Sequence, residues 1–148
     1  MKHILIATDG SPAARRAVEA GLELAAEHGG GATFVHVVPT DARIGGRKPF
    51  GRPLPHPVSV DEGETALMEA AEAAEVAGVS YALERIAGDP VDEIVALAET
   101  KDVDLVVVGS RGLGRVASAV LGSVSMGVLR RAGRPVLVVK DARAAVEA

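Results

Sequence analysis

Residues 104–139 read DLVVVGSRGLGRVASAVLGSVSMGVLRRAGRPVLVV, and their pattern indicates the fold class most clearly. Two short and nearly uninterrupted apolar runs, at residues 104–109 and 135–139, enclose a segment rich in glycine and serine that ends in two arginines. Apolar runs without alternation are typical of strands covered on both faces of a sheet. The arginines suit the negative carboxyl end of a helix, which Gly133 and Pro135 then end. The stretch therefore predicts a strand, a loop, a helix and a second strand of a parallel sheet.

The same alternation extends toward the amino terminus. Three more strands are predicted where apolar and β-branched residues gather, at residues 3–7, 32–38 and 79–85. Ser11–Pro12 and Asp89–Pro90 each place an N-cap residue before a proline, and an alanine-rich helix is expected over residues 64–77. The order β-α-β-α-β-α-β-α-β predicts a single doubly wound, Rossmann-like α/β domain with a five-stranded parallel sheet and helices on both faces. Ligands of such sheets bind beyond the carboxyl ends of the strands.

Length, composition and charge narrow the range of functions. A chain of 148 residues, with 48% apolar and 24% charged residues, is in the normal range for one globular domain. Sixteen lysines and arginines against twenty aspartates and glutamates leave a net charge of −4, so we expect no nucleic-acid partner. The sequence shows no secretory signal, no cysteine and no apolar stretch near the ~20 residues of a membrane span. We therefore expect a cytoplasmic protein that does not enter the membrane.

Residues 39–59, PTDARIGGRKPFGRPLPHPVS, interrupt the pattern. They hold five of the eight prolines and, apart from Asp41, only basic charges. Two interpretations remain open, a flexible surface loop and an ordered lid that contacts a ligand. Residues 141–148 are expected to form a short frayed tail.

The loop after residues 104–109 carries the strongest functional signal. Gly109 and Gly112 have two residues between them, and nine more separate Gly112 from Gly122 and Ser123. Glycines let backbone N–H groups approach an anion, and a helix start offers N–H groups that have no partner inside the helix. Positive charge and hydroxyl groups come from Arg111, Arg115, Ser123 and Ser125. The combination predicts a phosphate site, although each glycine alone also fits a tight turn or a close helix contact.

Two common phosphate motifs match poorly. A P-loop requires Gly-Lys-Ser or Gly-Lys-Thr, and no lysine lies between Lys101 and Lys140. Gly112, Gly114 and Ala117 match the G-x-G-x-x-A of dinucleotide-binding folds. In those folds the motif opens one β-α-β unit, and a second β-α-β half follows it in the sequence. Here only one predicted strand follows the motif.

The spacing Gly-x2-Gly-x9-Gly-Ser after an apolar strand resembles the ATP-binding branch of the universal stress protein family. The resemblance covers nearly the whole chain, including the opening ILIATDGS, the FVHVV of the second strand and the closing GSVSMGVLRRAGRPVLVV. It implies bound ATP and the strand order 3-2-1-4-5. By this resemblance, adenine and ribose would lie at the ends of the first two strands, against Ala7, Thr8, Asp9 and Val37. The ATP site would be completed around the phosphates by Gly109, Arg111, Gly112, Gly114, Arg115, Gly122, Ser123, Val124 and Ser125.

Asp9 has a second interpretation, because Asp-Gly-Ser-Pro is also good turn chemistry. The four histidines lack the spacing of a metal site, so we expect no metal held by protein ligands. Any Mg²⁺ is expected to be held mainly by the nucleotide phosphates.

The resemblance implies a stress-response protein in which bound ATP acts as a conformational signal. No acidic residue lies between Asp104 and Lys140 to activate water beside the γ-phosphate, so we expect slow hydrolysis at most and assign no catalytic residue. Two alternatives remain: an adenylyl-transferring enzyme of the nucleotide α-hydrolase-like group, and a dimerisation module without nucleotide. Family members pair their last strands across a two-fold axis, which implies a homodimer through Pro135–Val139.

Overall fold

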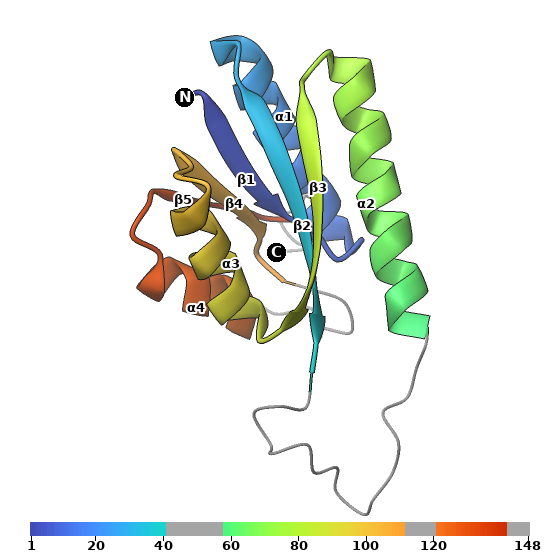
Figure 1. The fold of residues 1–148 in the computed structure, drawn as a ribbon, viewed down its shortest axis with the longest axis vertical. Coiled ribbons are helices and arrows are strands. Elements are labelled where there is room, and N and C mark those ends of the chain that lie inside the picture. Colours follow the sequence, from blue (N-terminus) through green and yellow to red (C-terminus); the bar gives the residue numbers. More distant parts are fainter. Residues whose placement is uncertain (41–57, 112–120, 142–148) are drawn as a thin grey trace, which may run out of the picture.

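The computed structural model describes residues 1–40, 58–111 and 121–141 (Figure 1). Along the chain the elements are β1 (His3–Ala7), α1 (Pro12–His28), β2 (Gly31–Pro39), α2 (Val58–Ala77), β3 (Tyr81–Gly88), α3 (Pro90–Thr100), β4 (Leu105–Gly109), α4 (Ser123–Arg131) and β5 (Val136–Val139). The strands form one parallel sheet in the order β3-β2-β1-β4-β5. The predicted α/β fold and strand order are confirmed.

The largest difference from the prediction is the start of α2. The helix begins at Val58 rather than at Glu64. Gly63 lowers helix propensity in isolation, but in the fold it lies against the buried ring of His36, and this packing outweighs the propensity. Pro39 ends β2 and Val58 starts α2, so only residues 41–57 of the predicted loop lie outside the described residues, as do residues 142–148 of the predicted tail.

Local capping explains why α1 and α3 begin where they do. The Ser11 side chain accepts a hydrogen bond from the Ala14 N–H at 3.2 Å, and the Asp89 carboxylate accepts one from the Asp92 N–H at 3.0 Å. In both helices a proline follows the cap, where its missing N–H costs nothing. At the far end of α1, Gly29 takes the left-handed conformation with φ of 64°, which ends the helix.

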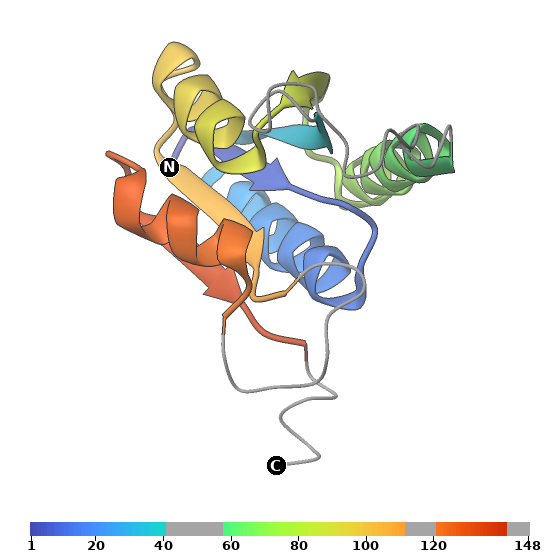
Figure 2. The same cartoon turned by 90° about the horizontal axis from the view of Figure 1, so that it is seen from below.

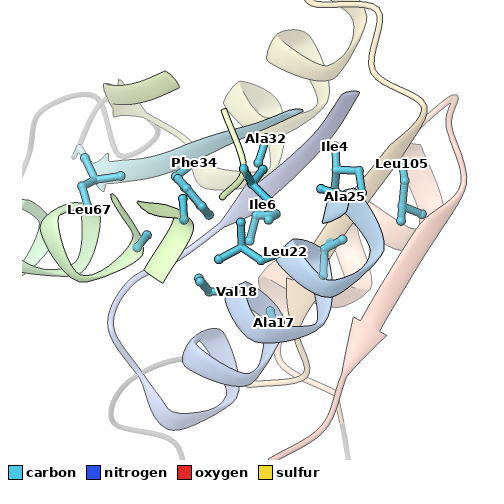
Figure 3. Packing of buried hydrophobic residues seen from close by; sticks show 14 residues of the cluster. Ile4, Ile6, Ala17, Val18, Leu22, Ala25, Ala32, Phe34, Leu67 and Leu105 are labelled. Atoms are coloured by element: carbon cyan, nitrogen blue, oxygen red, sulfur yellow. The ribbon is translucent and has the colours of Figure 1, made fainter. Parts of the chain in front are cut away.

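The sheet has a helical layer and a buried apolar cluster on each face. One cluster joins β1, β2 and β4 to α1 and α2; Figure 3 shows its packing around residues such as Ile6, Leu22 and Phe34. The other cluster packs Leu5, Val35 and neighbouring side chains against α3 and α4. Figure 2 looks onto the carboxyl ends of the strands and shows the two layers on either side. None of the helices among the described residues combines the length and hydropathy that crossing a membrane requires.

Among the described residues, β5 forms one edge of the sheet. All four of its residues are only half-buried, although its apolar sequence predicted a strand covered on both faces. The carbonyls of Pro135 and Val139 accept hydrogen bonds from the β4 side, at 2.9 and 2.8 Å. Because the direction of these groups alternates along a strand, the N–H and C=O of Val138 face away from β4, toward the free edge.

At the opposite end of the central strands, Asp104 ties the start of β4 to the start of β1. Its carboxylate accepts hydrogen bonds from the backbone N–H groups of Lys2, at 2.7 Å, and His3, at 3.0 Å. These two bonds hold the pKa of the Asp104 carboxyl below its ordinary value, because they stabilise the charged form.

Candidate functional site

A pocket of about 350 Å³ opens at the carboxyl ends of β1, β2 and β4. From β1 the chain turns to β2 on one side, and from β4 it turns to β5 on the other, so the pocket lies where the strand order reverses. Its volume is at the lower end of the range typical of small-molecule sites. The order of strands and helices in the sequence predicts a ligand at this position.

Every predicted site residue that the structure describes lines this one pocket. These residues come from four separate loops and strand ends, and they are Ala7, Thr8, Asp9, Val37, Gly109, Arg111, Gly122, Ser123, Val124 and Ser125. The remaining three, Gly112, Gly114 and Arg115, lie outside the described residues. That any of them binds a nucleotide stays a prediction.

The start of α4 lines one side of the pocket. The first hydrogen bond of the helix runs from the Met126 N–H to the Gly122 carbonyl, at 3.0 Å. The N–H groups of residues 123–125 precede that bond, and at this end the helix dipole is positive. Arg111 lines the same pocket and adds a full positive charge. This combination suits a phosphate group.

Two of the predicted phosphate ligands, Gly122 and Ser125, make hydrogen bonds within the fold. The Gly122 N–H donates to the Ser110 carbonyl at 2.7 Å. The Ser125 hydroxyl is 3% exposed and lies 3.0 Å from the carbonyl oxygens of both Ser110 and Gly122. Both groups therefore hold the end of β4 against the start of α4, rather than offering a donor to a ligand.

The end of β4 is also fixed against α1. The buried Ser11 hydroxyl, besides capping α1, donates to the Arg111 carbonyl at 3.4 Å. A side chain at Gly109 would come within 2.7 Å of the Ala13 carbonyl carbon and 2.8 Å of the Ala14 N. Glycine at position 109 thus allows the end of β4 and the first turn of α1 to meet.

Asp9 makes the turn that its sequence context predicts, and its contact with a nucleotide stays a prediction. Its carboxylate accepts a hydrogen bond from the Ser11 N–H at 2.9 Å, which is an Asx turn, and the same residue lines the pocket. The neighbouring Thr8 is buried, its carbonyl lies 3.0 Å from Nδ1 of His36, and its hydroxyl accepts the Gly10 N–H at 3.2 Å. The His36 Nδ1 faces a carbonyl oxygen, so this nitrogen must carry the proton.

Sequence reasoning missed the rest of the pocket wall. The additional lining residues come from α1, β2, the amino-terminal part of α2, α3 and β4, and they are Ser11, Ala14, Val35, His36, Pro39, Glu62, Pro90, Ile94 and Val108. Most are apolar, and only their position in the fold brings them to the site. Ser11 and Pro90 carried a signal as helix starts, because helix starts in this fold face the carboxyl edge of the sheet.

Comparisons with known proteins agree with this architecture. The family model described as "Universal stress protein family" matches residues 1–140. The chain is 34% identical over 139 residues to universal stress protein MJ0531 of Methanocaldococcus jannaschii, covering 94% of this chain and 82% of the relative.

Solved structures share the fold. The structure of MJ0577, from the same organism, superimposes with a TM-score of 0.77 at 28% identity, over 94% of this chain and 95% of that one. A universal stress protein in complex with cAMP superimposes with a TM-score of 0.69 at 29% identity, over 95% and 97% of the two chains. The chain therefore belongs to the universal stress protein family.

Proposed function

We propose that the chain binds ATP in the pocket at the end of β4, and that the nucleotide acts as a conformational signal in a stress response. The observation that carries the proposal is the convergence of ten predicted residues, distant in sequence, on one pocket. The start of α4 and Arg111 supply the charge and donors that phosphates need. The cAMP bound to a structural neighbour supports an adenine nucleotide as the ligand.

In this proposal the two ends of the pocket have different tasks. Apolar side chains such as Val37 and Ile94 would hold the base, and Asp9 would accept a hydrogen bond from the nucleoside. Gly109, Arg111 and the first turn of α4 would hold the phosphates. Among the described residues no group of three or more His, Asp or Glu is arranged to hold a metal ion, so the proposal assigns Mg²⁺ to the phosphates and water.

Nucleotide release tests the proposal most directly. The purified protein is denatured and the supernatant is chromatographed, and calorimetry then measures the binding of ATP with Mg²⁺. We expect an adenine nucleotide in the supernatant or a binding isotherm with ATP. No nucleotide, together with no heat at millimolar ATP, would favour the empty dimerisation module.

The same proposal includes that the bound ATP is hydrolysed slowly or not at all. Asp9 and Glu62 are the acidic residues among the described pocket lining, but neither belongs to the loop at the end of β4 that would hold the phosphates. A single-turnover experiment should therefore show much less than one ATP cleaved per second. Rapid ADP formation would contradict the signalling role, and release of pyrophosphate would favour the adenylyl-transferring enzyme.

The homodimer is the second part of the proposal. β5 is half-buried and directs the N–H of Val138 toward its open edge, and exposed edges of this kind tend to pair. A second copy paired along β5 would cover the apolar residues of the strand and continue the sheet. Light scattering should give the mass of two chains.

A further inference from the structure

We propose that Glu62 selects the nucleoside part of the ligand, by accepting a hydrogen bond from a ribose hydroxyl or from the exocyclic amine of the base. Glu62 lies in α2, an element to which the sequence assigned no part of the site. The inference rests on the proposed function, because it concerns a ligand in the same pocket. Three features of the structure support it.

The first feature is the placement of Glu62 on the pocket wall. Glu62 lines the pocket, although the residue is exposed. Ala66, four residues later, lies 3.4 Å from where a side chain at Gly10 would begin. Residues four apart share one face of a helix, so Glu62 faces the loop that carries Asp9 and Gly10.

The second feature is a close helix contact that fixes this placement. Any side chain at Gly63 would overlap Cδ2 and Nε2 of His36. The His36 ring cannot easily move aside, because it is 7% exposed and its Nδ1 donates to the Thr8 carbonyl at 3.0 Å. Glycine at position 63 thus lets α2 approach the end of β2 closely enough for the adjacent Glu62 to line the pocket.

The third feature is the chemistry of the described pocket lining. Asp9 and Glu62 are its carboxylates, and an ionised carboxylate only accepts hydrogen bonds. The Thr8 hydroxyl already accepts the Gly10 N–H, and the side chains of Val37 and Ile94 have no polar atoms. Ribose hydroxyls and an exocyclic amine are donors and match these carboxylates, whereas a keto group at the same position of the base would face them unfavourably.

Charge also argues for the nucleoside end. A carboxylate beside the phosphates would repel them, so Glu62 is compatible with a nucleotide only if it faces a neutral donor. The packing of the elements allows this, because α2 contacts β2 and β3, while α4 contacts α3 and β5. The two helices therefore lie at opposite edges of the sheet, α2 near β3 and α4 near β5.

The test compares Glu62→Ala with the wild-type protein by calorimetry with three ligands: ATP, 2′,3′-dideoxy-ATP and ITP. Dideoxy-ATP lacks both ribose hydroxyls, and ITP has a keto group in place of the amine. We expect Glu62→Ala to weaken ATP binding about three- to tenfold. The weakening should disappear with dideoxy-ATP if the donor is on the ribose, and with ITP if the donor is the amine.

Two further variants sharpen the result. Glu62→Gln keeps an acceptor oxygen and should bind ATP within about threefold of the wild type. Glu64→Ala removes a charge from an exposed position of the same helix that does not line the pocket, so it should leave ATP binding unchanged.

Two outcomes would overturn the inference. Glu62→Ala could bind ATP as tightly as the wild type or more tightly, or it could weaken all three ligands equally. Either result leaves the proposed function standing, because the wild-type protein still binds ATP. If the wild-type protein binds none of the three ligands, the proposed function itself fails, and this inference fails with it.

Discussion

Replacing Gly109 with alanine should damage both stability and binding, because this position is where β4 meets α1. The new methyl group would lie 2.7 Å from the Ala13 carbonyl carbon and 2.8 Å from the Ala14 N, both in the backbone. The first turn of α1 must move by about 0.7 Å before the contact becomes an ordinary one of 3.4 Å. Overpacking of this kind costs about 2 kcal/mol, within a typical range of roughly 1–3. For a domain of this size the midpoint of thermal unfolding should fall by about 4–8 °C.

Calorimetry measures both consequences on the same samples. Ser11 and Ala14 line the pocket, and Ser11 also bonds the Arg111 carbonyl, so a shift of α1 should weaken ATP binding as well. Gly29→Ala is the matched control. It strains the left-handed end of α1, with no atom within 4 Å of the new methyl group, so it should lower stability but leave ATP affinity intact. A Gly109→Ala protein with the melting temperature and affinity of the wild type would refute the reasoning.

Three other substitutions test separate contacts. Ser125→Ala should lower the free energy of unfolding, measured in urea, by about 1 kcal/mol, because it removes a buried hydroxyl. The loss should stay this small because the Ser110 carbonyl still accepts the Gly122 N–H. An unchanged midpoint of urea unfolding would show that the hydroxyl does not stabilise the fold. Asp104→Asn should destabilise the protein at neutral pH. Folding lowers the pKa of the Asp104 carboxyl, so this group stabilises the folded protein fully at any pH above its pKa in the unfolded chain. The stabilisation is lost as the pH falls through its pKa in the folded protein, so the melting temperatures of the two proteins should converge in acid. Val138→Pro removes an edge N–H without breaking the pairing of β5 with β4, so light scattering should find a folded monomer, and an unchanged dimer mass would count against pairing through β5.

The fold could be predicted from the sequence because its signals are local. Ser11–Pro12 and Asp89–Pro90 start helices by bonds within four residues, and the apolar runs of the strands need no knowledge of their neighbours. The start of α2 could not be predicted in the same way. Gly63 has low helix propensity, and the reason it is tolerated lies in His36, which is distant in sequence and adjacent only in the folded protein.

In the candidate site, too, some residues follow a local sequence pattern and others are brought in only by the fold. The glycine and serine spacing of the loop after β4 predicts that Gly109, Arg111 and Ser123 belong to one site, and the structure places all three on the pocket wall. Its other walls have no pattern of their own. Ile94 is an ordinary core residue of an amphipathic helix, and Glu62 is one of several glutamates on α2. The hydrogen bond from the Ser125 hydroxyl to the Ser110 carbonyl could not be predicted either, because it depends on where that carbonyl points in the folded protein.

The pocket takes its walls from both helical layers, since Ala14 belongs to the layer of α1 and Ile94 to that of α3. A molecule bound there touches both halves of the fold, and the unfolded chain offers no such site. Occupancy then adds to the free energy of unfolding, by about 2.7 kcal/mol at a ligand concentration a hundred times Kd. For a nucleotide ligand, the lifetime of the protein against proteases would rise and fall with nucleotide supply, which digestion with and without ATP measures directly.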